Sequence, residues 1–272
     1  MPATATRMPA LYIPHGAGPC FFMDWDPPGT WDRMADWLRG IPASLPARPT
    51  AIVVVTAHWR AARPSLSSAA QPDLLFDYGG FPQHTYALSY PAPGAPALAQ
   101  QVHELLARAG FEPMLDGARG YDHGTFVPLK VAFPKADIPV LQMSLLQSLD
   151  AAAHLRMGRA LAPLREQGVL ILGSGMSWHN QRAYGDADST RTARRFDDWL
   201  VATLARPAPE RDALLADWDN ASGSTGRFAH PPGREEHLLP LHVVAGAAPS
   251  SVGRKVFGDE VMNVQISAFR FD

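Results

Sequence analysis

The chain has 272 residues, a formal net charge of -2 at pH 7 and one cysteine, Cys20. Interspersed acidic and basic residues leave no basic field for a nucleic-acid backbone or an anionic membrane, so small molecules are the expected partners. A lone cysteine excludes an internal disulfide, so any metal must be held by histidine and carboxylate side chains. With neither an apolar run of about 18 residues nor a signal-peptide pattern, the protein is expected to be cytoplasmic.

Strands and helices alternate along the chain. Apolar runs predict strands over residues 10–13, 51–57, 138–145 and 168–175, and a helical spacing of apolar residues predicts helices over 30–38, 95–109, 151–166 and 190–204. The β-branched run from Ala51 to Ala57 is typical of a central strand that is covered on both faces. This alternation predicts an α/β fold, and the lack of a long linker favours one domain over residues 1–272.

The stretch from Arg206 to Gly233 is rich in Ala, Asp, Ser, Gly and Pro. It is the most loop-like part of the chain, and we interpret it as a mobile cover for a pocket.

Four histidines lie where a predicted element meets a turn: His15, His58, His179 and His237. In open α/β sheets, ligands gather outside the carboxyl ends of the strands. Neutral imidazole is a common ligand for zinc and non-haem iron, and a catalytic metal keeps about three protein ligands. The pattern therefore predicts a metal site assembled from distant segments at the carboxyl ends of strands.

The other histidines have simpler interpretations. His103 and His154 are expected to be solvated, His230 to lie on the surface and His242 to point away from the site, and His84 is a candidate for a pocket mouth. His123 has two interpretations that composition alone leaves open. It is either part of a turn in which Asp122 caps a helix beginning near Thr125, or a polar group that faces the site.

An ordered set of motifs resembles the class III extradiol ring-cleavage dioxygenases, in particular their DOPA 4,5-dioxygenase-like branch. The motifs extend from about Pro9 to the strand at Val264. They are Pro14–Gly16, Thr56–Trp59, Leu88–Pro96, Tyr121–Leu129, Ala136–Ser144, Gly173–Gly175, His179–Asn180 and His237–Leu241.

This resemblance implies a single α/β domain with a mixed central sheet flanked by helices. It implies metal ligands at His15, His58 and His237, an acid/base at His179 and a second pocket histidine at His123. Two alternatives stay open: Glu235 or Glu236 as the third ligand, and His179 as a further ligand. The resemblance also implies Fe²⁺ for activity, with Zn²⁺ as the alternative metal in purified protein, no organic cofactor, and a catechol and O₂ as reactants.

Aromatic residues beside strand ends are candidates for an apolar wall that contacts a flat substrate ring, namely Phe21, Phe22, Trp25, Trp59 and Trp178. Of these, Phe22, Trp59 and Trp178 are the predicted substrate-binding residues. A zinc-dependent hydrolase that uses the same histidines is the main alternative function, since bound zinc lowers the pKa of water to about 7. A metal-holding protein without catalysis is a third alternative. The sequence leaves the oligomeric state open.

Overall fold

A computed structural model describes residues 6–272. Within these residues, one sheet of eight strands has the order β4-β3-β5-β2-β6-β1-β8-β7. The strands are β1 (Ala10–Pro14), β2 (Ala51–Ala61), β3 (Ser65–Ser67), β4 (Met114–Asp116), β5 (Val140–Leu146), β6 (Val169–Gly175), β7 (Gly253–Val261) and β8 (Val264–Phe271). Strands β5, β2, β6 and β1 are parallel, whereas β8 pairs antiparallel with β1 and β7. The predicted α/β class with a mixed sheet is confirmed.

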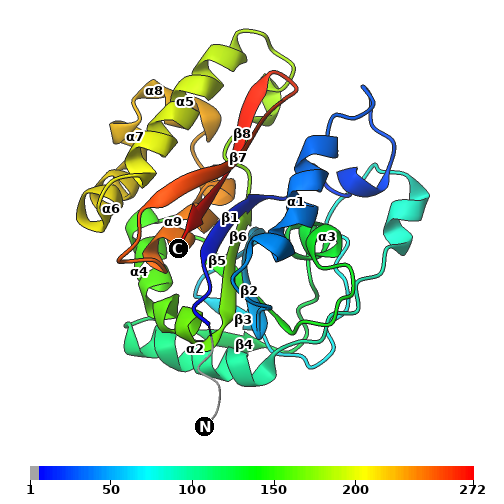
Figure 1. Ribbon diagram of the computed structural model, residues 1–272, viewed down its shortest axis with the longest axis vertical. Coiled ribbons are helices and arrows are strands. Elements are labelled where there is room, and N and C mark those ends of the chain that lie inside the picture. Colours follow the sequence, from blue (N-terminus) through cyan, green and yellow to red (C-terminus); the bar gives the residue numbers. More distant parts are fainter. Residues whose placement is uncertain (1–5) are drawn as a thin grey trace.

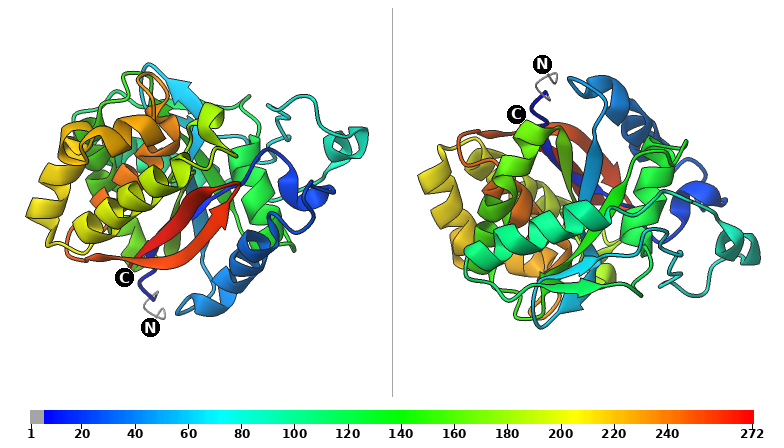
Figure 2. Two further views of the ribbon diagram at one scale, coloured as in Figure 1. Left: turned by 90° about the horizontal axis from the view of Figure 1, so that it is seen from above. Right: turned by 90° about the horizontal axis from the view of Figure 1, so that it is seen from below.

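Helices cover both faces of this sheet (Figures 1 and 2). The α-helices are α1 (Asp32–Ser44), α2 (Pro96–Arg108), α3 (His123–Ala132), α4 (Ala151–Leu161), α5 (Ser189–Leu204), α6 (Ala208–Ala216), α7 (Trp218–Ala221), α8 (Ser224–Ala229) and α9 (Leu239–Gly246). The short 3-10 helices are η1 (Cys20–Phe22), η2 (Gln83–Ala87), η3 (Ala162–Gln167), η4 (Gln181–Ala183) and η5 (Glu235–His237). Helices α1 and α3 pack together on one side, while α9 packs on β6, β1 and β2 and against α4 on the other.

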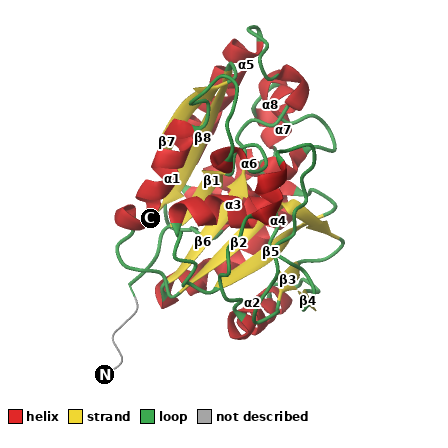
Figure 3. Cartoon of the chain, turned by 90° about the vertical axis from the view of Figure 1, so that its right-hand side faces the viewer, coloured by secondary structure: helices red, strands yellow, loops and turns green. Residues whose placement is uncertain are grey.

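The sheet interior follows from the sequence of its central strands. Every residue of β1, β5 and β6 is buried, as is β2 from Ala51 to Ala57. A strand covered on both faces needs apolar side chains at every position rather than at alternate ones. The strands therefore fix one another's position, and Figure 3 shows them as one continuous layer behind α3.

Two predicted helices differ from the observed ones towards their carboxyl ends, at positions with a nearby glycine or proline. The first helix continues to Ser44, past Gly40 and with Pro42 inside it, whereas the prediction ended at Leu38. The predicted helix over 151–166 becomes α4 followed by η3, because Pro163 removes a backbone donor. The predicted helices over 95–109 and 190–204 are present as α2 and α5.

The prediction of a loop-like cover over 206–233 is wrong. This stretch forms α6, α7 and α8, and Leu215, Trp218 and Ala229 are buried. Alanine is the best helix former, so the Ala-rich composition that resembled a loop supports short helices, and Pro207 and Gly223 mark their starts. The segment therefore belongs to the packed body of the protein.

At one edge of the sheet, β7 and β8 form a hairpin whose turn contains Met262 and Asn263, both with positive φ. None of the helices within residues 6–272 combines the length and the apolar character that crossing a membrane requires. The predicted domain extent of 1–272 includes residues 1–5, which lie outside the described residues.

Candidate metal centre and cavity

Two histidines are delivered by neighbouring parts of the sheet. His15 directly follows β1, and His58 lies in β2 beyond the segment that pairs with β6. Because β1 and β2 both pair in parallel with β6, their carboxyl ends lie at the same edge of the sheet. The Nε2 atoms of the two imidazoles are 3.3 Å apart.

A third histidine reaches the same place from η5. The side chain of His237 is buried, and its backbone carbonyl accepts hydrogen bonds from the Tyr12 hydroxyl at 2.7 Å and from the backbone N–H of Met176 at 3.2 Å. A Cβ at Gly175 would lie 2.1 Å from the same carbonyl oxygen, so η5 can approach the end of β6 only because residue 175 has no side chain. The core of the sheet thus positions His237.

His123 is the first residue of α3, and Asp122 caps that helix by accepting a hydrogen bond from the backbone N–H of Thr125 at 3.2 Å. The two interpretations of His123 are therefore compatible, because the residue lies in a capped helix start and its ring also lies against His58, with 3.8 Å between the ring centroids. A Cβ at Gly124 would meet the His58 ring at 2.9 Å, so glycine is required for this approach.

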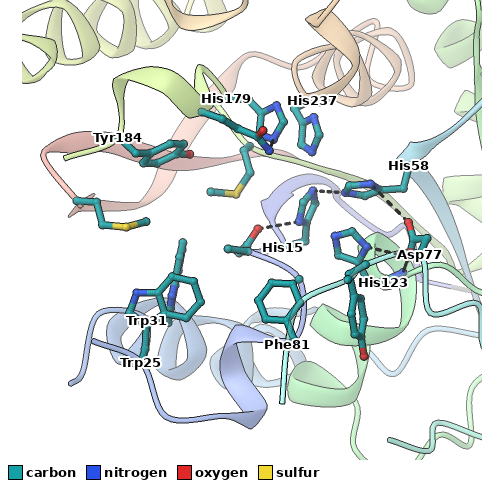
Figure 4. Close-up of a pocket in the computed structure, with 18 residues that line it drawn as sticks. His15, Trp25, Trp31, His58, Asp77, Phe81, His123, His179, Tyr184 and His237 are labelled. Atoms are coloured by element: carbon teal, nitrogen blue, oxygen red, sulfur yellow. Dashed lines mark hydrogen bonds and ion pairs between the residues drawn. The ribbon is translucent and has the colours of Figure 1, made fainter. Parts of the chain in front are cut away.

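The fifth histidine of the cluster, His179, follows β6. Its ring stacks on that of His237, with 3.3 Å between centroids and 16° between planes. All five predicted site histidines therefore converge at one edge of the sheet, and Figure 4 shows them together.

Two carboxylates each link a pair of these histidines. Asp77 accepts hydrogen bonds from Nδ1 and from the backbone N–H of His123, at 2.8 and 2.9 Å, and its other oxygen is 3.6 Å from Nδ1 of His58. Glu236 places one oxygen 3.3 Å from Nδ1 of His237 and 3.9 Å from Nδ1 of His179. The hydrogen-bonded carboxylates, Asp77 for His123 and Glu236 for His237, fix the ring orientation and the tautomer of those two imidazoles, whereas Nδ1 of His179 has no hydrogen-bond partner among the described residues.

The cluster favours neutral imidazoles. Burial, followed by the neighbouring histidines, lowers the pKa of His15 and His237 well below the ordinary value. Burial and then His123 lower the pKa of His58 to about 3, although Asp77 acts in the opposite direction. Burial is also the main cause that lowers the pKa of His179 to about 4. Neutral imidazole is the form that binds a metal or accepts a proton.

The donor set fits a metal ion. Nε2 of His237 is buried without a hydrogen-bond partner among the described residues. The ring centroids of His15, His58 and His237 are 4.9, 5.0 and 5.1 Å apart. Imidazoles bound to one ion at about 2.1 Å, with ligand angles between about 90° and 110°, have centroids about 4.5–5.3 Å apart. The groups whose ligand atoms all lie within 4.8 Å of one another are His15, His58 and His123 and, separately, His179, Glu236 and His237. In these groups the centroids of His58 and His123 are only 3.8 Å apart and those of His179 and His237 only 3.3 Å apart, which is closer than two imidazoles bound to one ion lie.

The histidines form one end of a cavity of about 490 Å³. Its other described lining residues are Gly16, Ala17, Gly18, Trp25, Trp31, Asp77, Tyr78, Gly79, Phe81, Met176, Gln181, Tyr184 and Met262. In Figure 4, Trp25, Trp31 and Tyr184 lie at the end away from the histidine cluster.

The three predicted substrate-binding aromatics lie outside this lining. Trp178 is buried in the core, where its ring lies 5.6 Å from that of Phe228, and Trp59 is buried with the guanidinium of Arg119 5.0 Å from its ring centroid. Phe22 is half-buried, with the Lys130 ammonium 5.7 Å from its ring. Of the other two aromatic candidates, Trp25 is part of the described lining and Phe21 is not.

Two other histidines have a different environment from the one expected: His154 and His230 are fully buried rather than solvated, and each hydrogen-bonds to the backbone. His242 lies in α9 outside the cavity lining, where it is buried and its Nε2 is 2.9 Å from the carbonyl oxygen of Leu215. His84 is exposed, with Nε2 3.0 Å from the carbonyl oxygen of Phe22, and it lies outside the described cavity lining.

The sequence interpretation overlooked Asp77, Trp31, Phe81, Tyr184 and Met262. Most of them lie in irregular connections, where periodicity gives no signal. The only available sequence signal for Asp77 was an acidic residue just before Tyr78, Gly79 and Gly80 in a long loop, which is weak.

Comparison with known proteins gives a consistent result. Residues 9–269 match the family described as the catalytic LigB subunit of aromatic ring-opening dioxygenase. The chain is 37% identical to dioxygenase tasH of Hapsidospora irregularis, over 97% of this chain and 86% of that protein. It is 38% identical to the 4,5-DOPA dioxygenase extradiol of Escherichia coli K12, over 90% of this chain and 86% of that protein.

A plant relative and a solved structure agree with this. The 4,5-DOPA dioxygenase extradiol of Portulaca grandiflora is 40% identical over 78% of this chain and 76% of that protein. The crystal structure of the uncharacterized protein JW3007 from Escherichia coli K12 superposes with a TM-score of 0.78 at 31% identity, covering 98% of this chain and 100% of that one.

Proposed function

The chain belongs to the LigB family of aromatic ring-opening dioxygenases, and we propose that His15, His58 and His237 hold its metal. The protein is a non-haem, metal-dependent enzyme that cleaves a catechol-type ring in the extradiol position with O₂. The observation that carries this ligand assignment is the near-equal spacing of the three rings. Each of them also has an oxygen atom near Nδ1: the carbonyl of Gly16 for His15, Asp77 for His58 and Glu236 for His237. In each ring, Nε2 is then the atom available to a metal.

We propose ferrous iron as the working metal. Ferrous iron with three protein ligands supplies open coordination positions at which a catecholate and dioxygen are activated together. Because zinc binds nitrogen ligands more tightly than ferrous iron in the usual affinity order, aerobically purified protein is expected to contain some zinc.

The remaining two histidines are assigned to proton handling. His179 is neutral at pH 7 and lines the cavity, so its ring can accept a proton from a catechol hydroxyl and hold it for return to the product. His123 also lines the cavity, and because Asp77 accepts the hydrogen bond from its Nδ1, its Nε2 is the atom left to contact a substrate oxygen. His179 and His123 are thus assigned to two different oxygen atoms of the reactants.

The positions of the carboxylates near the histidine cluster bear on the alternative function, a zinc-dependent hydrolase. A hydrolase would add a carboxylate base that faces the reacting water. Asp77 and Glu236 lie instead against histidine Nδ1 atoms, and the buried Asp122 is held by Thr56 and Arg119. The family and the named relatives favour ring cleavage, and none of them favours hydrolysis.

The test is dioxygen uptake by protein reconstituted anaerobically with ferrous iron and presented with DOPA, protocatechuate and plain catechol. The expected result is uptake of O₂ together with absorbance of a yellow ring-opened product. Protein that binds one equivalent of iron but consumes no O₂ with a broad catechol panel would contradict the proposal.

A further inference from the structure

The cavity is larger than the reacting part of the substrate requires. At about 490 Å³ it falls in the range of about 300–1,000 Å³ that is typical of sites for drug-sized ligands. If the diol lies at the histidine end, the opposite end, with Trp25, Trp31 and Tyr184, is left for a ring substituent. This end of the cavity can therefore discriminate between substrates by their ring substituent.

That end offers no cation for an anion. Among the described lining residues there is no lysine or arginine. Arg182 and Arg234 are exposed and lie outside the lining, although the charge of Arg234 reaches His179. A carboxylate placed beside the tryptophans would lose part of its hydration without gaining a cation, which is unfavourable.

Three polar side chains of the wall are already engaged. The hydroxyl of Tyr184 donates to the carbonyl oxygen of Trp178 at 2.9 Å, and that of Tyr78 donates to the carbonyl oxygen of Thr85 at 2.8 Å. Asp77, the lining carboxylate, is committed to His123. What remains for a substituent is aromatic and thioether surface with two neutral polar groups, the Trp31 indole N–H, which has no hydrogen-bond partner among the described residues, and the exposed Gln181 amide.

Met262 completes this surface from the tip of the β7–β8 hairpin. It has a φ of 47°, which is uncommon for a residue with a side chain and persists only where the surroundings hold it. The surroundings here are specific: the backbone N–H of Gly185 donates to the carbonyl oxygen of Met262 at 2.8 Å, and the Asn263 amide donates to the carbonyl oxygen of Gly185 at 3.0 Å. A flexible thioether is thus held in the wall, where it adapts to varied apolar shapes.

We propose, on the basis of the ring-cleaving function above, that the substrate is a catechol whose ring carries an uncharged, largely apolar substituent that packs against Trp25, Trp31 and Met262. The absence of a cation at this end selects against catechols with a carboxylate on the side chain. Met262 is a specificity-determining residue.

The first test compares two catechols of similar length, 4-propylcatechol and 3-(3,4-dihydroxyphenyl)propanoate, with the iron-loaded enzyme. The expected kcat/KM is at least about tenfold higher for the neutral compound, which corresponds to about 1.4 kcal/mol. Calorimetric titration of the zinc-loaded protein should give the same order of affinity without turnover.

Equal or better use of the carboxylate, or of 2-(3,4-dihydroxyphenyl)ethylamine, would overturn the proposal. Such a result would leave ring cleavage itself intact, whereas metal-loaded protein that turns over none of these compounds contradicts both.

The second test introduces the missing cation. Met262→Lys should raise kcat/KM for the carboxylate relative to the neutral compound by about tenfold. Val252→Lys is the matched control, since residue 252 is 53% exposed, lies outside the lining and adds the same charge, and it should not change the ratio. An unchanged ratio in Met262→Lys, or a loss of carboxylate turnover in Arg234→Gln, would show that the substituent lies elsewhere and overturn the proposal.

Discussion

The two ends of the cavity are built differently. At the histidine end, His15 and His58 are carried by β1 and β2, and His237 is held through its backbone by Tyr12 and Met176. At the aromatic end, the wall comes from connections between elements, including the segment between η1 and α1, the loop before η2 and the β7–β8 turn. The difference indicates that the reaction depends on the sheet, whereas substrate choice depends on connections that can change without disturbing the sheet.

The largest effect is expected from the histidine end. His58→Ala should remove a ligand, so that the protein loses its metal and its ring-cleaving activity falls to background. His103→Ala, at a half-buried position on α2 outside the cavity lining, is the control and should retain both. Metal content is measured after reconstitution and gel filtration, and one tightly bound equivalent in His58→Ala would contradict the ligand assignment.

A smaller effect at the same end is expected from Asp77→Asn. The amide keeps an oxygen acceptor for His123 but removes the charge shared with His58. Loss of such an outer carboxylate typically costs about 10–100-fold in metal affinity or activity, so kcat should fall while KM changes little. Asp73→Asn, at an exposed position in the same loop, is the matched control. If kcat is equal in the two variants, Asp77 does not position these rings.

At the aromatic end, a change should affect binding instead of chemistry. Trp25→Ala should raise KM for 4-propylcatechol about threefold to tenfold, consistent with the loss of an aromatic contact of about 0.5–1.5 kcal/mol, and should leave kcat for plain catechol near its original value. Trp37→Ala removes a tryptophan that packs on Phe257 outside this cavity, and KM should not change. A fall in kcat for both catechols in Trp25→Ala would contradict the separation of the two ends.

The smallest effect on turnover is expected away from both ends, at His154. Its Nδ1–H donates to the carbonyl oxygen of Asp150 at 2.6 Å, and its Nε2 accepts from the backbone N–H of Leu146 at 3.0 Å, so only the neutral ring fits. Burial lowers its pKa to about 4 in the folded state, against about 6.5 in the unfolded chain. As the pH falls from 6.5 towards 4, the unfolded chain binds the proton first, and the free energy of unfolding decreases by up to about 3 kcal/mol.

His154→Gln should therefore lower the free energy of unfolding at pH 7.5 but make it less dependent on pH. Urea unfolding at pH 7.5 and pH 5 measures both quantities, with the wild-type chain as the reference. Identical pH dependence in the two proteins would show that His154 is not the group that titrates. kcat at pH 7.5 should be close to that of the wild type.

Sequence reasoning succeeded where local pattern and fold coincide. The run from Ala51 was predicted as a central strand and the run ending at Gly175 as a strand, and both are present as β2 and β6. The Asp122 cap was one of two open interpretations of that turn, and the helix begins at His123 rather than near Thr125. Histidines directly after such strands must converge, because the carboxyl ends of parallel strands lie at one edge.

Apart from Trp25, the aromatic wall could not be predicted in this way. Trp59 and Trp178 are adjacent in sequence to site histidines, but successive residues of an extended chain point to opposite sides, so both are buried in the core. Met262 and Tyr184 reach the cavity through the packing of a hairpin turn against the segment after η4, which no local pattern records. The Ala-rich stretch over 206–233 was misread because its helices are short and their buried faces have little periodicity.

Gly124 has a consequence for how this site can evolve. Any side chain there would collide with the ring of His58 and with the Thr56 hydroxyl, while the Gly124 carbonyl accepts a hydrogen bond from Ser174 on β6. A mutation at this one codon therefore disturbs a proposed ligand, the pocket histidine beside it and the central strand together. Variants at residue 124 are therefore expected to impair His58 and His123 together, and a descendant that abandons ring cleavage is expected to lose Gly124 early.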